Sequence, residues 1–574
     1  MKIHTLNDVI TELVAACPEK GIGFIEPDGQ IKFISFRQTY EHALKILSGL
    51  RSRNLASGNF VLIALEKNEE VIPSLWACFL GGMIPSLLQA PMSFSSHNLQ
   101  AAKLENIWNL MNKPHMIVSD KAFHAWRELG KDFHFLNFDT ISQSAPDHHI
   151  VKTQAEDIAY VQFSSGSTGN PKGVMLTNKN MLSNIHDIAT NNRFKPSDVS
   201  LNWMPLFHDM GLVGFHLTPI YVQSTHYFID TVNFVKNPSL WLDSISNLRV
   251  EVTAAPNFGQ ALTLRHLARK KNESWDFSSV TSFFNGAEPI SADIMTRFID
   301  EMAKYGFRDT AMIPCYGMAE ATLAISMRNE AVSPTITSFD RINLFNNKLA
   351  VETQSQEDGV QLVGVGQVLG HTQIRIVDEN GNILPDNHVG HIHIKGDNVT
   401  KQFYKPDVDE AELFNESWLL TGDMGLIYKG ELYITGRAKD LIIINGQNYY
   451  AHDLEQVIVQ SKPELYGKIA CVSVFDQFIG REKLIAFVVG PSDPKHFDQY
   501  RNIGKAFHSK LGIHLDEIIP VSSAEIHRTS SGKLQRYKLV HDYQKDLFKG
   551  HSKIFRPTTK ASKGLPDIHA NLKL

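Results

Sequence analysis

The stretch Val161–Leu176, VQFSSGSTGNPKGVML, puts a loop rich in glycine, serine and threonine between two apolar runs. The runs Ile158–Phe163 and Gly173–Thr177 are strand-like in composition, so we expect the loop to join two strands. It offers many hydroxyl and backbone N–H donors, little bulk and one mobile charge, that of Lys172. These properties suit a loop that wraps around phosphate, and an ordinary surface turn is the plainer alternative.

The context of the loop argues against a Walker-type phosphate site. A Walker loop opens directly into a helix and has Ser or Thr after its lysine. Here a glycine follows the lysine, and a strand comes next. A helix is expected only afterwards, capped by Thr177, with an apolar face formed by Met181, Ile185 and Ile188.

The composition is that of an ordinary globular protein with more than one domain. A chain of 574 residues exceeds what one hydrophobic core supports, and 43% hydrophobic with 20% charged residues is typical of soluble proteins. The net charge of −5 gives no general reason to bind nucleic acid or an anionic membrane. The cysteines are too scattered for a disulfide framework or a zinc site: Cys17, Cys78, Cys315 and Cys471.

No segment predicts a signal peptide or stable membrane insertion. The first twenty residues have no sufficiently long apolar core. The apolar stretch Val71–Met92 is interrupted by glycines and prolines, which favours a buried helix followed by a strand over a membrane span. We therefore expect a cytoplasmic protein.

The order of elements predicts a large α/β body and a small α+β domain. Strand-like and helix-like segments alternate through the first four hundred residues. After GRAKD we expect a helix at 452–460, strands at 468–475 and 483–490, and a helix from Phe497 to Leu511. A junction near Lys439 divides the chain into domains 1–438 and 439–574.

Two hairpins and a tail complete the organisation. Arg375–Leu384 contains an Asn-Gly turn between extended runs, and Gly425–Gly436 has the pattern of a second hairpin. From about Lys549 the chain is polar and basic enough to be a loose tail.

Several short motifs follow the loop in a fixed order, and each alone could be a turn, a solvated helix or a linker. Together they make the chain resemble the adenylate-forming superfamily from about residue 10 to 545. The motifs are FHDMG (207–211), NGAEP (285–289), YGMAEAT (316–322), TGD (421–423), GRAKD (436–440) and TSSGK (529–533). The resemblance implies the fold of acyl/aryl-CoA synthetases and luciferase, an α/β fold with a multi-subdomain N-terminal body and a small mobile α+β C-terminal domain.

Within that superfamily the chain looks most like the fatty acyl-AMP ligases. YGMAEAT has Ala319 and Ala321 where acyl-CoA synthetases usually read Thr-Glu-Gly. The long stretch Met327–Gly366 resembles the insertion, here within about 328–365, that limits domain movement and disfavours transfer to free CoA in these ligases. An ordinary long loop is the alternative.

The resemblance implies a role for each matched residue. Glu320 would help to hold Mg²⁺, for which an oxygen ligand is suitable. Asp423 and Arg437 match the ribose-binding pair, and Lys533 matches the lysine that reaches the substrate carboxylate and the α-phosphate. The loop residues Ser165, Gly166, Ser167, Thr168, Gly169 and Lys172 would hold the β- and γ-phosphates of ATP. Adenine would bind at Asn285, Gly286 and Ala287 beside Tyr316, Gly317 and Met318.

The acyl site and the joint between domains are also implied. His208 would lie near the carboxylate at the mouth of the acyl site, or would be a packed core histidine. The side chains expected to line a fatty-acyl tunnel are Met210, Gly214, Phe284 and Met318. Lys439 matches the hinge position. Gln447 and Ala451 depart from the Arg and Pro that members often carry, which concerns docking of the carrier protein.

The leading hypothesis is activation of a fatty acid by ATP to acyl-AMP and pyrophosphate. The acyl group would then pass to the phosphopantetheine of an acyl carrier protein or polyketide synthase. The alternatives are a long-chain fatty acyl-CoA synthetase and a catalytically silent nucleotide-binding scaffold. An amino-acid-activating domain is disfavoured, because nothing near His208 or Phe284 is an obvious buried acid to pair with an α-amine.

Overall fold

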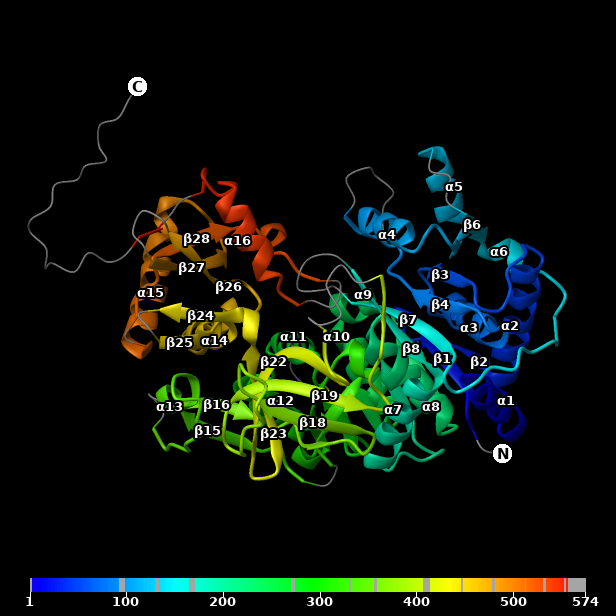
Figure 1. Cartoon of the computed structure of the whole chain (residues 1–574), viewed down its shortest axis with the longest axis horizontal. Helices are drawn as coiled ribbons and strands as arrows, with labels where there is room; N and C mark the ends of the chain where they lie inside the picture. The colour runs from blue at the N-terminus through cyan, green and yellow to red at the C-terminus, as the bar shows by residue number, and fades with distance from the viewer. Residues whose placement is uncertain are drawn as a thin grey trace, which may run out of the picture. The chain divides into compact units, whose positions relative to one another are not determined.

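The computed structural model describes residues 3–91, 99–130, 134–164, 171–269, 274–329, 332–355, 359–405, 413–444, 447–476, 481–511, 513–529, 533–551 and 554–555. The chain divides into two compact units. The first comprises Met1–Gln354 and Gly359–Ala438, and the second comprises Lys439–Leu574 with Ser355–Asp358. The first unit holds β1–β23 and α1–α13, and the second holds β24–β29 and α14–α16 (Figure 1).

A largely parallel sheet forms the centre of the first unit. Among the described residues its strand order is β17-β14-β13-β12-β11-β9-β10-β1-β2. Neighbours from β13 to β1 are parallel, whereas β2, β14 and β17 pair antiparallel at the two edges. The strands are β1 (Gly21–Ile25), β2 (Ile31–Ser35), β9 (Ser200–Asn202), β10 (His226–Ile229), β11 (Val252–Ala254), β12 (Ser282–Asn285), β13 (Met312–Gly317), β14 (Ala324–Met327) and β17 (Gln367–Val368). The predicted α/β class is confirmed.

Helices connect these strands, because a chain that returns to a parallel strand must cross a face of the sheet. The connecting helices are α9 (Thr231–Lys236) and α10 (Pro238–Asn247) before β11, α11 (Asn257–Leu267) before β12, and α12 (Ala292–Ala303) before β13. Phe283 of β12 contacts Trp241 of α10 and Phe298 of α12, with ring centroids 5.9 and 5.0 Å apart. Strands and helices therefore share one apolar core.

That core also contains a buried chain of neutral hydrogen bonds. Trp76 of α3 (Asn68–Leu80) donates from Nε1 to Nε2 of His216 at 3.0 Å, and Nδ1 of His216 lies 3.1 Å from Nε2 of His226. Since an indole only donates, His216 accepts at Nε2 and carries its proton on Nδ1. Burial lowers the pKa of both histidines, that of His226 to about 3.

The apolar stretch Val71–Met92 forms the predicted buried helix and strand. Helix α3 is buried from Val71 to Leu80 and is followed by β4 (Ile84–Leu87). This strand belongs to a separate parallel sheet, of order β4-β3-β5-β6, with β3 at Phe60–Ala64, β5 at His115–Val118 and β6 at Phe135–Asn137. Among the helices that the structure describes, none has the length and hydrophobicity needed to cross a membrane.

The strands expected on both sides of the Gly/Ser loop are present. β7 (Ile158–Ser164) and β8 (Lys172–Thr177) pair antiparallel, and β20 (Phe403–Tyr404) pairs with the other side of β8. Thr177 caps α7 (Asn178–Asn191) in a reciprocal capping box with Asn180. The apolar face predicted for this helix is buried, at Met181, Ile185 and Ile188.

An antiparallel sheet completes the first unit. Its strands are β18 (Thr372–Val377), β19 (Gly390–Gly396), β21 (Phe414–Asn415), β22 (Trp418–Tyr428) and β23 (Glu431–Arg437). The predicted Gly425–Gly436 hairpin is confirmed, and its turn residues Lys429 and Gly430 both have positive φ, as a type I′ turn requires. The Arg375–Leu384 hairpin is one bridge long, between Val377 and Ile383, because β18 pairs along its length with β19 instead.

The long stretch after Met327 forms an ordered module. β15 (Ile336–Asp340) pairs antiparallel with β16 (Gly359–Val363), and α13 (Arg341–Phe345) follows β15. The module is anchored to β23: the Arg328 guanidinium lies 3.1 Å from Glu431, and Thr337 hydrogen-bonds Tyr433 at 2.9 Å. In its described part it is a folded hairpin attached to the body.

The second unit contains the predicted helices and strands. They are β24 (Leu441–Ile444), β25 (Gln447–Tyr450), β26 (Ile469–Asp476), β27 (Arg481–Val489), β28 (Glu517–Val521), β29 (Ile554–Phe555), α14 (Ala451–Ser461), α15 (Phe497–Leu511) and α16 (Arg536–Gln544). β26 to β29 form one sheet in chain order. The expectation of a loose tail from about Lys549 is wrong at β29, which pairs with β28, and 556–574 lie outside the described residues.

Candidate functional site

Glu320 lies on η3 (Ala319–Ala321), a single helical turn between β13 and β14. Burial raises the pKa of its carboxyl group, and the positive charges of Arg437 and Lys172 act in the opposite direction. The negative charge of Asp209 raises the pKa further. Three charged side chains from distant parts of the chain therefore act on one partly buried carboxylate.

Besides the charged groups around Glu320, a second cluster of side chains is centred on Asp423, whose side chain is 8% exposed. The Tyr316 hydroxyl donates to its Oδ2 at 2.7 Å, and Nε of Arg437 donates to its Oδ1 at 3.1 Å. Asp423 and Arg437 face each other across β22 and β23, and Tyr316 comes from β13. Burial and the neighbouring carboxylate raise the pKa of Tyr316 well above its usual range, so the phenol stays protonated and donates.

The segment after β12 runs very close to β13. A Cβ on Gly286 would lie 2.7 Å from Sγ of Cys315, and Ala287 has φ of +68°. The side-chain nitrogen and oxygen of Asn285 are buried with no partner among the described residues. An amide left unpaired in this way is costly, and it fits a site completed by a group with both a donor and an acceptor, such as the edge of a purine.

A second glycine, Gly317, permits another close approach. A Cβ on Gly317 would lie 1.8 Å from the Leu323 carbonyl oxygen, so only glycine fits where β13 meets the turn after Glu320. The backbone N–H of Met318 donates to the Leu323 carbonyl at 2.8 Å, and Met318 is partly buried.

The predicted phosphate loop is described only at its ends. Lys172 begins β8 opposite Ser164, while the loop residues Ser165, Gly166, Ser167, Thr168 and Gly169 lie outside the described residues.

His208 is neither fully buried nor free. Its Nδ1 lies 2.7 Å from Oδ1 of Asp209, and the two side chains are 18% and 14% exposed. The segment is attached to β7 because Nε2 of Gln162 donates to the Phe207 carbonyl at 2.9 Å. Asp209 was missed by the sequence reasoning, although it lies within the quoted FHDMG motif.

Two of the four acyl-site candidates, Met210 and Phe284, share one core cluster. Met210 and Gly214 lie on η1 (Met210–Leu217), a π-helical segment of the kind often found at functional sites. A Cβ on Gly214 would contact Leu323 at 3.3 Å, and the Phe284 ring meets that of Phe215 edge-on at 6.3 Å. Met318 packs against a different cluster, around β14, β18 and β19.

Lys439 and Lys533 belong to the second unit. Lys439 lies on the short helix η5 (Ala438–Asp440), at the boundary between the units. The backbone of Lys533 is bonded twice to Thr529: its N–H donates to Oγ1 of Thr529 at 3.0 Å, and its carbonyl accepts from the Thr529 N–H at 2.8 Å. The guanidinium of Arg536 pairs with both oxygens of Glu455 on α14, at 2.8 and 2.9 Å.

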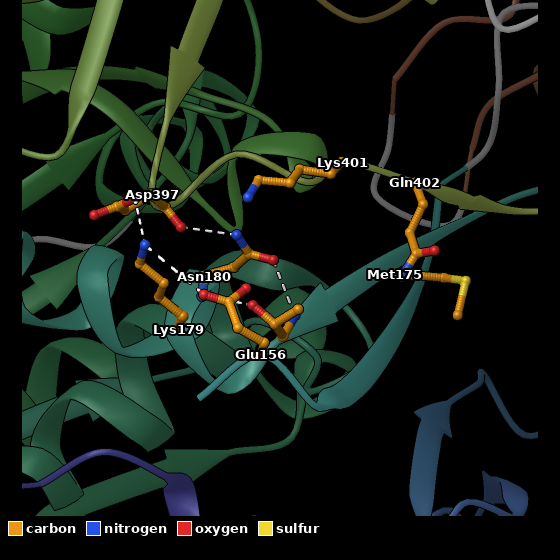
Figure 2. Close-up of a pocket in the computed structure, with 8 residues that line it drawn as sticks. Glu156, Met175, Lys179, Asn180, Asp397, Lys401 and Gln402 are labelled. Carbon is orange, nitrogen blue, oxygen red and sulfur yellow. Dashed lines mark hydrogen bonds and ion pairs between the residues drawn. The ribbon is translucent and has the colours of Figure 1, made fainter. Parts of the chain in front are cut away.

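A cavity of about 280 Å³ lies beside β8 and the start of α7 (Figure 2). Lys179 is 2.8 Å from Asp397, and Nδ2 of Asn180 donates to the Asp397 carbonyl at 2.7 Å. The cavity is lined by Glu156, Met175, Thr177, Lys179, Asn180, Asp397, Lys401 and Gln402. None of the predicted site residues is among these, and two carboxylates balance its two ammonium groups.

Comparison with known proteins gives the family. The sequence profile of the AMP-binding enzyme family matches residues 17–404, about two thirds of the chain. The chain belongs to this family.

Relatives of this AMP-binding enzyme act on different acids. It is 28% identical to a 4-hydroxyphenylalkanoate adenylyltransferase of Mycobacterium marinum, with 96% of this chain and 92% of the relative covered. It is 34% identical to a medium-chain-fatty-acid–acyl-carrier-protein ligase of Teredinibacter turnerae, with 66% of this chain and 62% of the relative covered. A structure from a study of fatty acyl-adenylate ligases of E. coli and L. pneumophila superposes with a TM-score of 0.86 at 30% identity, covering 95% and 99% of the two chains.

The AMP-binding enzyme is therefore an adenylate-forming ligase that activates an acid through an acyl-adenylate, and its fold is the adenylate-forming fold predicted from the motifs. Among the described residues, no group of three or more His, Cys, Asp or Glu side chains could hold a metal ion. A site with a single protein carboxylate fits Mg²⁺, which is commonly held by one or two carboxylates together with substrate phosphates.

Proposed function

We propose that this enzyme is a fatty acyl-AMP ligase that loads an acyl carrier protein. The observation that carries the proposal is that Tyr316 and Arg437 both bond Asp423, at 2.7 and 3.1 Å. The charges of Arg437 and Lys172 also act on the partly buried Glu320 carboxylate, so distant motifs meet at one place. The fatty-acid branch is supported by the names of two of the relatives and by the folded module between Met327 and Gly366.

In the first step a carboxylate oxygen attacks the α-phosphorus of ATP. The new O–P bond forms as the bond to the β-phosphate oxygen breaks, and pyrophosphate leaves with the electron pair. In the second step the phosphopantetheine sulfur attacks the acyl carbonyl, the bond to the AMP oxygen breaks, and the thiol proton passes to solvent. Both steps bring anions together, so the chain has to supply positive charge and orientation.

Each residue has one task in this scheme. Asp423, oriented by Arg437 and Tyr316, accepts the ribose hydroxyls. Lys172 pairs with the phosphates of ATP, together with the loop Ser165–Gly169. Mg²⁺ when bound would neutralise phosphate oxygens, and Glu320 would hold it. Lys533, carried by the second unit, would stabilise the charge that develops at the carboxylate and α-phosphate, and Lys439 would be the hinge between two poses of that unit.

The cluster of Tyr316, Asp423 and Arg437 would bind the nucleotide and does not select between acid substrates. That selection has to come from the apolar residues. Met210 and Phe284 lie in one apolar cluster, and the space beside Gly214 is bounded by Leu323, which packs against that cluster. Such surroundings suit an alkyl chain better than a charged side chain. The described acid beside them is Asp209, whose Oδ1 accepts from the Met210 N–H at 2.7 Å and lies 2.7 Å from Nδ1 of His208. A fatty acid needs no acidic partner, so phenylalanine in the assay below tests the alternative of an amino-acid substrate.

The test is a product assay with ATP, Mg²⁺ and dodecanoate, alongside 4-hydroxyphenylpropanoate and phenylalanine as competing acids. Each reaction is run alone, with free CoA, and with carrier protein that has or lacks its phosphopantetheine arm. The expected result is dodecanoyl-AMP that is stable to CoA and consumed only by the armed carrier protein. Rapid formation of acyl-CoA would instead identify a conventional synthetase, and ATP binding without pyrophosphate release from any acid would identify a silent scaffold.

A matched variant sharpens the assay. Asp423→Asn keeps the volume of the side chain and removes its charge, so pyrophosphate exchange should fall with every acid. Removal of the β15–β16 module should raise transfer to CoA if the module limits acceptor choice.

A further inference from the structure

The turn that follows Glu320 has an unfavourable backbone. Thr322 has φ of +68° and ψ of −55°, and the Leu323 N–H donates to the Ala321 carbonyl at 2.8 Å. This is a γ-turn of the rare strained hand, and its central residue is β-branched. Such a conformation persists only where the surrounding structure determines it.

A buried asparagine holds one end of this turn. Asn184 of α7 is fully buried, its Nδ2 donates to the Ala324 carbonyl at 2.7 Å, and its Oδ1 accepts from the Ala324 N–H at 2.9 Å. The amide thus occupies both backbone groups of one residue, as a neighbouring strand would. Ala324, the residue bonded in this way, is the second residue after Thr322.

Asn398 and Thr400 hold the other end. The Thr322 hydroxyl donates to the Asn398 carbonyl at 2.8 Å, and Nδ2 of Asn398 lies 3.3 Å from the Ala321 carbonyl. The Thr400 N–H donates to the carbonyl of Glu320 itself at 2.8 Å. Every residue from Glu320 to Thr322 therefore has a backbone or side-chain bond to this segment.

The same segment is tied to the strand that carries Lys172. The Thr400 hydroxyl donates to the Met175 carbonyl on β8 at 2.6 Å. At the start of α7, Asn180 donates to the Asp397 carbonyl at 2.7 Å (Figure 2). It also donates to the Val399 carbonyl at 3.1 Å. Hydrogen bonds thus join helix α7, the segment 397–400 and β8 into one frame. The turn after Glu320 is bonded to both α7 and the segment 397–400.

We propose that Asn184 and Asn398 are positioning residues, which hold the strained turn at Thr322 so that the Glu320 carboxylate stays facing Lys172 and Arg437. Neither touches the reacting atoms. The inference rests on the proposed function for the task of Glu320, while the frame itself is independent of it. A turn that relaxed to an ordinary β-turn would redirect the carboxylate without unfolding the protein.

The first test replaces Asn184 by Leu, which is of similar size and makes neither hydrogen bond. Asn192→Leu is the matched control, because Asn192 lies at the far end of the same helix, is buried, and bonds the Ile188 carbonyl and Sδ of Met327 rather than the turn. Hydrogen exchange of residues 316–325, a window that leaves out Met327, should quicken at least tenfold in Asn184→Leu and remain unchanged in Asn192→Leu. Equal exchange in the two variants would overturn the proposal.

The second readout is a double-mutant cycle with Glu320→Gln in pyrophosphate exchange. Asn184→Leu should lower kcat at least tenfold with KM for the acid within twofold, and should cost less than twofold when Glu320→Gln is already present. Additive effects would mean that Asn184 acts only on stability. If the wild-type enzyme exchanges pyrophosphate with no acid, the proposed function has failed, and the hydrogen-exchange result still decides the role of the frame.

Thr322→Gly guards against a variant that fails to fold. Glycine accepts the positive φ without strain, so the thermal midpoint should be unchanged or raised. The turn loses both its strain and its hydroxyl bond to Asn398, so kcat should still fall at least fivefold. Full activity in this variant would show that the strained turn has no part in orienting Glu320.

Discussion

Acid should destabilise the first unit through its buried histidine chain. Histidine has a pKa of about 6.5 in an unfolded chain, whereas burial lowers the pKa of His226 to about 3. At pH 8 both states are neutral and His226 contributes nothing to the pH dependence. Below pH 6.5 His226 is protonated in the unfolded chain but stays neutral in the folded chain. The free energy of unfolding therefore falls by about 1.4 kcal/mol per pH unit. At pH 5 the loss from His226 alone is about 2 kcal/mol.

The assay is urea unfolding at pH 8 and pH 5, followed by tryptophan fluorescence. All seven tryptophans lie before residue 439, so the signal reports only the first unit. His226→Gln keeps an acceptor for His216 and removes one titrating group, so it should lose about 2 kcal/mol less than the wild type between the two pH values. His124→Gln is the control, because that side chain is 64% exposed. Equal losses in the wild type and His226→Gln would refute the reasoning.

Three further predictions concern the site and the second unit. Tyr316→Phe removes the donor to Asp423, which should cost about 1.5 kcal/mol and raise the KM for ATP about tenfold in pyrophosphate exchange; an unchanged KM would remove Tyr316 from the nucleotide site. Gly317→Ala forces a Cβ against the Leu323 carbonyl and should lower the free energy of unfolding by more than about 2 kcal/mol, whereas Gly370→Ala, whose Cβ would lie 3.5 Å from its nearest contact, should be nearly neutral in the same urea titration. Arg536→Met leaves Glu455 buried without its partner and should destabilise the second unit by about 3–5 kcal/mol, seen as faster hydrogen exchange in α14 while the tryptophan transition stays in place.

Local features were predictable from the sequence because their causes are local. The strands around the Gly/Ser loop, the cap at Thr177 and the Lys429-Gly430 turn each depend on residues a few positions apart. The motif order was enough for the fold class, since the superfamily has one fold. The short Arg375–Leu384 hairpin shows the limit of such local prediction. β18 pairs with β19 along its whole length, whereas the pairing across its own turn is a single bridge.

The residues that the sequence reasoning missed have distant partners. Asn184 meets Ala324 across 140 residues, and Asn398 meets Ala321 across 77. A buried asparagine has no periodicity of its own, so nothing in the neighbouring residues distinguishes it from one in a surface turn. Asp209 was hidden for another reason: it was read as part of a motif, and only the folded chain brings its charge near Glu320.

The two-residue strand β29 has a practical consequence for how the protein can be shortened. β28 is buried along its whole length, with β27 on one side and Ile554–Phe555 on the other. A truncation after Gly550 would strip that cover and leave the open edge of a hydrophobic strand available to a second molecule, a known route to aggregation. Shortened variants of this enzyme should therefore end beyond Phe555. Insolubility of a variant that ends earlier would be due to the exposed edge of β28 and would not mean that the second unit cannot fold.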